Sequence, residues 1–305
     1  MSESKKPSLA IVTLTYNNWD LLENCIASVF KQNLETVGEV EFSITDDGTH
    51  DFNYKFVQST VEKWSQGSRV RTAININESN IGTVASFNRA INRTESDIIV
   101  ILSADDAFYD NSVLSKVTRE FETGASQIIT TKRSVCDKSL TKEMRIEPSD
   151  NFKPLFKEKN ELNLYKYIAT KGNIISGASV CFTKKIYDEL GGFDENYRLL
   201  EDYPFFLKAL ENNINIKFCD FVSIKYSDSG VSAPVGSSLN PMLKSDFVKL
   251  YKRLLESNNL TVFQKRRIFY SKCLDISEKK SLYNILRYLE QFLYSAFKKL
   301  KLFYR

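Results

Sequence analysis

Apolar runs alternate with amphipathic stretches along the first 135 residues of the chain. Five apolar runs have the length and composition of strands, and they lie at 8–14, 39–46, 70–77, 97–102 and 126–133. The segments between them favour helices; in 18–32, for example, Leu22, Ile26 and Val29 fall on one helical face. This alternation predicts an α/β fold with a mixed, mostly parallel sheet flanked by helices.

The pattern changes further along the chain. Residues 136–170 are polar, charged and less regular, so we expect irregular structure there. A short helix ending at Gly191-Gly192, a second helix opening at Glu201-Asp202 and a strand at 214–226 follow. From Pro241 the pattern is helical to the end. We therefore expect two parts, a domain over 1–240 and a C-terminal helical extension over 241–305.

The composition of the 305-residue chain, 42% hydrophobic and 26% charged, is ordinary for a soluble globular protein. No apolar run is long enough to span a bilayer, and no apolar leader opens the chain, so we expect a cytoplasmic protein. Five isolated cysteines argue against a disulfide framework or a zinc site. Because His50 is the only histidine, acid–base or metal chemistry must depend on carboxylates.

Polar clusters follow three of the predicted strands directly. They are Thr15-Tyr16-Asn17, Asp46-Asp47-Gly48 and Asp105-Asp106. In an open α/β sheet the carboxyl ends of parallel strands meet at one edge, and ligands bind in the crevice there. The three clusters are thus expected to form one site.

The carboxylates in these clusters allow two interpretations. Asp46 and Asp47 suit a turn with a helix cap, or a site that accepts hydrogen bonds from a nucleotide base or ribose. Asp105 and Asp106 repel each other unless water, hydrogen-bond donors or a cation neutralise them. Since their oxygens are hard ligands, the implied cation is Mn²⁺ or Mg²⁺, held partly by a substrate diphosphate. Neither a Gly-x-Gly-x-x-Gly motif nor a Walker lysine loop follows any strand.

Glu201 and Asp202 form a third acidic pair, at the start of a predicted helix. The helix dipole favours acidic residues there, which explains the pair structurally. Alternatively, one of the two carboxylates takes a proton from an attacking hydroxyl.

Taken in order, these motifs resemble those of bacterial glycosyltransferase family 2, of the non-processive, surface-polysaccharide type. The resemblance covers about residues 8–235 and rests on "TLTYNNWDLLENCIASVFKQ", "ITDDGTHD", "NESNIGTVASFNRAI", "VILSADDAF", "SGASVCFTKKIYDELGGFDE" and "EDYPFFLKA". It implies a GT-A fold and an inverting transfer of a sugar from a nucleoside-diphosphate donor.

The resemblance also implies roles for individual residues. The donor nucleotide is expected to contact Thr15, Tyr16, Asp46, Asp47, Asn80, Gly82, Ser103 and Asp105. Asp105 and Asp106 are expected to hold the metal; Ser103 stands where many members have Asp and ligates a metal poorly. Asp202 corresponds to the general base, with Glu201 beside it in the acceptor pocket. Gly230-Val231-Ser232 resembles a flexible segment that folds over the donor.

The positive charge of the chain is concentrated at its end. Residues 265–305 hold eleven Lys or Arg and three Asp or Glu, whereas the formal charge of the whole chain is +4. Apolar residues from Leu282 to Leu300 fall on one helical face. This pattern is typical of a helix docked on the domain or of an amphipathic helix on an anionic membrane, and we favour the membrane. A nucleic-acid partner is not expected, since no binding motif accompanies the basic residues.

We therefore expect an enzyme, a hexosyltransferase that moves one sugar from a nucleoside-diphosphate sugar, above all a UDP-sugar, to an acceptor hydroxyl. The expected acceptor is a lipid-linked oligosaccharide in O-antigen (lipopolysaccharide) or capsular polysaccharide assembly, at the inner face of the cell membrane. The alternatives are a non-catalytic sugar-nucleotide-binding subunit and a nucleotidyltransferase that makes an activated sugar. The latter class usually carries a Gly- and Arg-rich signature after its first strand, where this chain has "TLTYNNWD".

Overall fold

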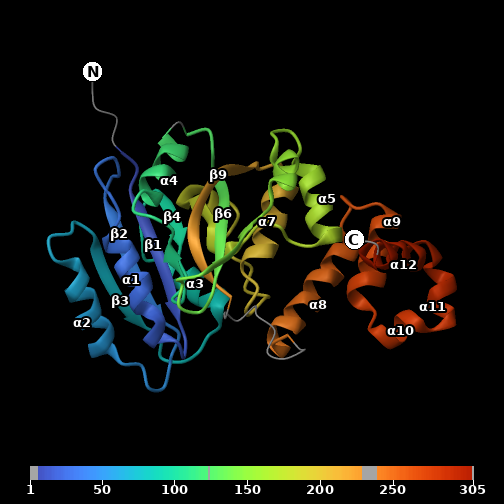
Figure 1. The fold of residues 1–305 in the computed structure, drawn as a ribbon, viewed down its shortest axis with the longest axis horizontal. Coiled ribbons are helices and arrows are strands. Elements are labelled where there is room, and N and C mark those ends of the chain that lie inside the picture. Colours follow the sequence, from blue (N-terminus) through green and yellow to red (C-terminus); the bar gives the residue numbers. More distant parts are fainter. Residues whose placement is uncertain (1–5, 123, 229–238, 304–305) are drawn as a thin grey trace.

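A computed structural model describes residues 6–122, 124–228 and 239–303 of the protein, with side chains up to residue 296. One twisted sheet lies at the centre with helices on both faces (Figure 1). The strands are β1 Leu9–Thr15, β2 Val40–Asp46, β3 Arg71–Ile76, β4 Ile98–Ile101, β5 Ala107–Phe108, β6 Ile128–Cys136, β7 Glu143–Glu147, β8 Val180–Thr183 and β9 Ile216–Ser227. The α-helices are α1 Leu22–Phe30, α2 Tyr54–Ser65, α3 Thr83–Ile91, α4 Val113–Glu122, α5 Glu161–Lys171, α6 Lys184–Glu189, α7 Asp202–Glu211, α8 Pro241–Glu256, α9 Val262–Ile268, α10 Ile276–Lys280, α11 Leu282–Arg287 and α12 Leu289–Phe303.

The sheet is parallel at its centre and mixed toward one side. The strand order is β3-β2-β1-β4-β8-β6-β9-β5, with β7 paired to β6. Strands β1 to β4 run parallel to one another, β6 runs parallel to β9, and β8 is antiparallel to both β4 and β6. The predicted α/β fold, with a mixed sheet flanked by helices, is confirmed.

Both faces of the central strands are buried, which explains their unbroken apolar sequences. In β1, Leu9 and Ile11 pack with α1, α2 and α4 on one face, while Ala10 and Val12 pack with α3, α5 and α7 on the other. All four residues are fully buried. The two resulting cores hold the sheet rigid, so its carboxyl edge is a fixed support for the loops that follow the strands.

Residues 136–170, expected to be irregular, contain β7, a 3₁₀ segment over Asp150–Phe156 and helix α5. The buried side of α5 carries Leu164, Tyr165 and Ile168. Because this helix is short and its apolar positions lie among Lys, Asn and Glu, its periodicity is hidden in a polar background. The expectation was therefore wrong at this point.

The C-terminal region is helical, as predicted, but it is not one continuous amphipathic helix. A π-helical turn over Phe269–Cys273 follows α9, and the chain breaks again at Ser281 and Tyr288. Ser281 is extended and its hydroxyl caps α11 at the Asn284 N–H, 3.2 Å away. Tyr288 is buried against the rings of Phe269 and Tyr270. Local capping and aromatic packing thus override the longer periodicity.

Helix α8 packs against the helices that cover one face of the sheet rather than standing apart from them. Leu250 and Leu254 belong to the same buried cluster as α5 and α7. Asp246 is also buried, and its Oδ2 accepts the backbone N–H groups of Arg198 (2.8 Å) and Leu199 (2.7 Å). This carboxylate therefore holds the loop that leads into α7. The boundary near residue 240 stays a prediction.

Across the described ranges, no helix combines the length and the apolar character that crossing a bilayer requires.

Replacing Asp246 should show how strongly it holds this loop. We expect Asp246→Leu to lower the free energy of unfolding by about 1–3 kcal/mol, because two part-buried N–H groups lose their acceptor. Asp246→Asn should cost clearly less, since an amide oxygen still accepts both hydrogen bonds. Urea denaturation of the two variants measures the difference; equal losses in both would contradict this role.

Candidate active site

The loops after β1 and β2 join at the carboxyl edge of the sheet, as predicted. Thr15 pairs with Asp46 in the strand register, and the Asp47 N–H donates to the Thr15 carbonyl at 2.9 Å. The Asn17 N–H donates to Thr49 Oγ1, also at 2.9 Å. Tyr16 is left projecting from this junction with 48% of its surface exposed. An exposed ring at this edge is suited to stacking against a planar ligand group.

Asp46 and Asp47 are both buried and bind the backbone of neighbouring loops. Asp46 Oδ2 accepts the Thr49 N–H at 2.7 Å. Asp47 accepts the N–H groups of Ile81 (3.2 Å) and Gly82 (2.9 Å) and the side-chain amide of Asn77 (2.8 Å). These carboxylates shape the loops of the predicted nucleotide site. Their direct contact with a nucleotide stays a prediction.

Two glycines allow the loops after β2 and β3 to approach closely. Gly48 (φ +76°) has room for no side chain, because a Cβ there would lie 2.4 Å from the Ser79 carbonyl carbon. At Gly82 (φ +93°) a Cβ would lie 2.6 Å from Arg198 Cγ. Asn80, between these contacts, accepts two hydrogen bonds from Arg198 Nη2, at its Oδ1 (2.6 Å) and its carbonyl (3.0 Å).

Arg198 thus joins the predicted nucleotide loop to the segment preceding α7, whose backbone Asp246 holds. Sequence reasoning missed both residues. Arg198 lies more than a hundred positions from Asn80, and Asp246 lies in the region assigned to the extension. No local pattern marks either one.

Asp105 and Asp106 follow β4 and have different surroundings. Asp105 is half-buried, whereas Asp106 is fully buried and its Oδ1 accepts the Ser227 N–H at the end of β9 (2.8 Å). Burial raises the pKa of both carboxyls, and the charge of Asp105 raises that of Asp106 further. Ser103, two positions before Asp105, is half-buried at the same edge.

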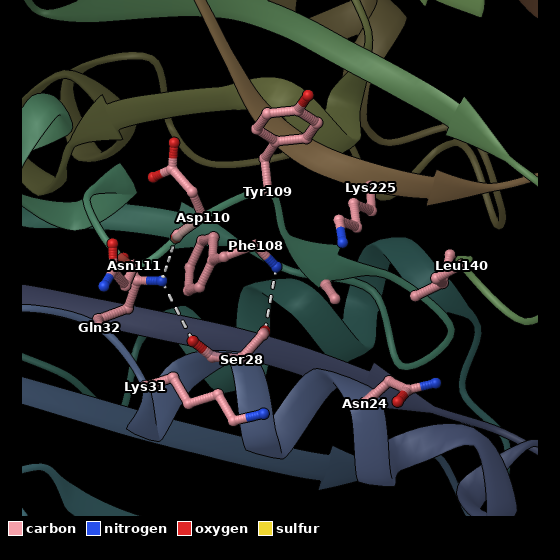
Figure 2. A pocket seen from close by; sticks show the side chains of 11 residues that line it. Asn24, Ser28, Lys31, Gln32, Phe108, Tyr109, Asp110, Asn111, Leu140 and Lys225 are labelled. Carbon is pink, nitrogen blue, oxygen red and sulfur yellow. Dashed lines mark hydrogen bonds between the residues drawn. The ribbon is translucent and has the colours of Figure 1, made fainter. Parts of the chain in front are cut away.

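Helix α1 holds the strand that follows this acidic pair. Figure 2 shows the contact beside a cavity of about 270 Å³ between α1, β5 and β9. The Phe108 N–H donates to Ser28 Oγ at 3.0 Å, and the Gln32 amide donates to the Asp110 carbonyl at 2.7 Å. Because β5 begins directly after Asp106, these bonds fix the turn that carries both carboxylates.

The acidic pair fits a divalent cation. Within the described residues, Asp106 Oδ2 is buried without a hydrogen-bond partner, and the charge of Arg133 compensates a negative charge on this carboxylate only in part. A cation bound by Asp105 and Asp106 would supply that compensation and favour the ionised carboxylates that burial disfavours. Among the same residues, no group of three or more His, Cys, Asp or Glu side chains comes together as a metal site. Two protein carboxylates leave coordination positions for phosphate oxygens and water.

Glu201 and Asp202 lie at the N-terminal end of α7, as predicted. Asp202 Oδ1 accepts the Tyr203 N–H at 2.6 Å, and Oδ2 accepts the Gly177 N–H at 3.2 Å. A Cβ on Gly177 would lie 3.0 Å from the Asp202 Cβ, so the glycine permits this close approach. Burial raises the pKa of both carboxyls, and with the charge of Asp202 it raises the pKa of Glu201 to about 8.

Arg133, on β6, acts electrostatically on one carboxylate of each acidic pair. Its Nη1 donates to Ser176 Oγ (2.8 Å), next to Gly177, and its Nη2 donates to Glu147 (2.9 Å). Burial raises the pKa of both Asp106 and Asp202, and the charge of Arg133 lowers both in part. The guanidinium therefore lies within electrostatic reach of both carboxylates. Sequence reasoning missed it, because a single arginine in a strand has no distinguishing pattern.

Two parts of the sequence prediction are not described by the structure. Gly230-Val231-Ser232 lie in the interval 229–238, outside the described residues. The same holds for the side chains of the tail beyond residue 296. The described part of α12 contacts α5 and α9, where Lys171 Nζ and the Arg267 guanidinium lie over the Tyr294 ring at 4.9 and 4.5 Å.

Solved structures with a similar fold include two nucleotide-sugar complexes. S. aureus TarS residues 1–349 in complex with UDP-GlcNAc matches with a TM-score of 0.61 and 18% identity, over 87% of this chain and 71% of that one. The mannosyltransferase PcManGT from Pyrobaculum calidifontis, in complex with GDP-Man and Mn²⁺, matches with a TM-score of 0.58 and 14% identity, over 90% of this chain and 71% of that one. This chain spans 43% of a longer TarS structure. At these identities the comparison supports the GT-A fold.

The sequence comparisons agree. An uncharacterized glycosyltransferase of Methanocaldococcus jannaschii is 25% identical over 228 residues, which are 74% of this chain and 72% of that protein. Residues 10–191 match the profile of glycosyl transferase family 2, and this is more than half of the chain. The chain therefore belongs to glycosyl transferase family 2 and is a glycosyltransferase that takes its sugar from a nucleotide-sugar donor.

Proposed function

We propose that this enzyme inverts the configuration of the transferred sugar in one displacement, with Asp202 as the general base. The supporting observation is the placement of Asp202. Two backbone N–H groups orient its carboxylate at the edge of the sheet, with Arg133 within electrostatic reach of both Asp202 and Asp106. A fixed carboxylate opposite the donor diphosphate is what such a displacement requires.

In this reaction Asp202 accepts the proton of an acceptor hydroxyl. The hydroxyl oxygen forms a bond to the anomeric carbon while the bond from that carbon to the diphosphate oxygen breaks, and the electron pair leaves with the diphosphate. Glu201, whose raised pKa keeps it largely protonated at neutral pH, is available to donate a hydrogen bond in the acceptor pocket. The proton and charge therefore balance within the site.

The donor occupies the loops described above. Thr15, Tyr16, Asp46, Asp47, Asn80, Gly82, Ser103 and Asp105 are proposed to contact its nucleotide, a UDP-sugar above all. Mn²⁺ or Mg²⁺, held by Asp105 and Asp106, would stabilise the negative charge on the diphosphate when bound. Glu201 and Asp202 face the acceptor from α7.

The proposed acceptor is a lipid-linked saccharide in the assembly of a surface polysaccharide, such as O-antigen or capsule, at the cytoplasmic face of the membrane. The excess of Lys and Arg over acidic residues in 265–305 supports a peripheral contact with anionic lipid. Such a contact would bring the enzyme to an acceptor that does not leave the bilayer.

Removing the proposed base should abolish transfer while the donor still binds. We expect Asp202→Asn to lower the transfer rate about 100- to 10,000-fold, the range for a positioned general base. Nucleotide-sugar binding, measured by calorimetry, should stay close to that of the wild type. The control is Asp188→Asn, which replaces an exposed carboxylate that pairs with Lys184. Wild-type turnover by Asp202→Asn would exclude the assigned role.

The pKa of Glu201 predicts a pH-dependent stability. Between the ordinary value of 4.5 and about 8, the unfolded chain has released the Glu201 proton while the folded protein keeps it. The free energy of unfolding should therefore fall as the pH rises through this window. Glu201→Gln has no such proton to lose. The free energy of unfolding of this variant, relative to that of the wild type, should therefore increase from pH 5 to pH 9. Urea titrations at several pH values measure this; a constant difference would contradict the raised pKa.

Metal binding should depend on Asp105. We expect Mn²⁺ with UDP to raise the melting temperature of the wild type, because a ligand that binds only the folded state stabilises it. The increase should be lost in Asp105→Asn and kept in Asp188→Asn. An undiminished increase in Asp105→Asn would exclude Asp105 as a ligand.

A further inference from the structure

Helices α10 and α11 lie at the end of the molecule opposite β3 (Figure 1). They carry a cluster of exposed apolar side chains. It consists of Ile276, Leu282, Tyr283 and Leu286, which are 74, 72, 66 and 66% exposed. We call this cluster the α10–α11 surface. Four large apolar side chains within eleven consecutive residues, all facing solvent, are costly in water unless something covers them.

The charges around this surface have one predominant sign. Residues 262–287 contain seven Lys or Arg and only two carboxylates, Asp275 and Glu278. Both carboxylates serve locally, because they form the capping box at the start of α10. Burial of the Lys272 ammonium lowers its pKa, and the neighbouring charges of Lys279 and Arg267 lower it further, so cations crowd here. An anionic partner would relieve this repulsion.

We propose that the α10–α11 surface docks the enzyme on an anionic lipid bilayer. Its apolar side chains would enter the interface between headgroups and acyl chains, and Lys272, Lys279, Lys280 and Arg287 would contact the headgroups. A second copy of the chain fits less well, since a symmetric contact would bring two surfaces of the same charge together. Leu282 and Leu286 belong to the helical face expected from sequence, whereas Ile276 and Tyr283 do not. Tyr288 and Tyr294 pack the start of α12 toward α9 and α5.

The position of the surface suits a membrane-bound acceptor. In Figure 1 the chain enters β1 from the top, so the carboxyl edge of the parallel strands faces the lower side of the view. Helix α10 lies toward the same lower side. The lipid-linked acceptor and a peripheral contact with anionic lipid belong to the proposed function, on which this inference rests; the inference adds which side chains make the contact.

Vesicle flotation of the full-length protein tests this proposal. The probes are vesicles of phosphatidylcholine alone and of phosphatidylcholine mixed with phosphatidylglycerol. The test variant is Ile276→Ser/Leu282→Ser/Leu286→Ser. The matched control is Val262→Ser/Phe263→Ser, which removes two apolar side chains, each 72% exposed, at the start of α9 and outside the surface.

We expect the wild type and the control to float with the anionic vesicles and much less with the neutral ones. The triple variant should lose at least about tenfold in its partition coefficient, since it removes most of the apolar area that inserts. Equal flotation of the triple variant and the control would overturn the proposal. So would a wild-type dimer in sedimentation that the triple variant dissociates, because a second copy would then cover the surface.

A second assay, hydrolysis of the nucleotide sugar in solution, measures the catalytic site without a membrane. It therefore distinguishes a failure of docking from a failure of the proposed function. The triple variant should hydrolyse the donor at the wild-type rate, because its substitutions lie far from α7 and β4. Loss of flotation with unchanged hydrolysis supports docking whatever the acceptor is.

Discussion

Hydrogen bonds between aspartate carboxylates and backbone N–H groups hold the loops of the active site together. Each of these carboxylates accepts a backbone hydrogen bond. The donor lies either in another segment of the chain or in the turn that directly follows the aspartate. Asp46 accepts from Thr49, Asp47 from Ile81 and Gly82, Asp106 from Ser227, Asp202 from Gly177 and Tyr203, and Asp246 from Arg198 and Leu199. Hydrogen bonds to charged groups are stronger than those between neutral groups, and breaking one would leave a buried charge. The loops are consequently shaped before a donor binds.

This arrangement divides the acidic residues into two kinds. Asp47 is buried and uses both of its oxygens on the protein, whereas Asp106 is buried with Oδ1 bound to the Ser227 N–H and Oδ2 left without a hydrogen-bond partner. Asp105, Glu201 and Asp202 remain half-buried, at positions that a ligand can reach. In a site of this kind several partly desolvated carboxylates lie near one another and near Arg133. The pKa of each carboxyl therefore depends on the charges of its neighbours and on any cation that binds.

The sequence predicted the parallel strands well, because a strand buried on both faces, such as β1, has an unmistakable apolar run. It also placed Thr15, Asp47 and Asp105 at one edge, since the carboxyl ends of parallel strands must meet, whereas the role expected of Asp202 came from the family resemblance. It did not predict what each carboxylate binds. The Asp47 contacts with Ile81 and Gly82 depend on how two loops pack, and one strand-end motif does not determine that packing.

Long-range partners were missed for a similar reason. Arg198 meets Asn80 only after the sheet has formed, and Arg133 lies within electrostatic reach of Asp106 and Asp202 only because β6 lies beside β8 and β9. Helix α5 was missed because its apolar stripe is short. In the tail, periodicity alone suggested one helix, whereas the Ser281 cap and the packing of Tyr288 divide it.

The position of Asp246 has a consequence for how modular this enzyme is. Its carboxylate comes from α8, yet the backbone it orients leads on one side to the Arg198–Asn80 contact and on the other to the helix that carries Asp202. The loops proposed to bind the donor and the acceptor therefore share one support. A chimaera that joins residues 1–240 to another C-terminal region must therefore keep α8. Without it the backbone at Arg198 and Leu199 would lose the carboxylate that positions it.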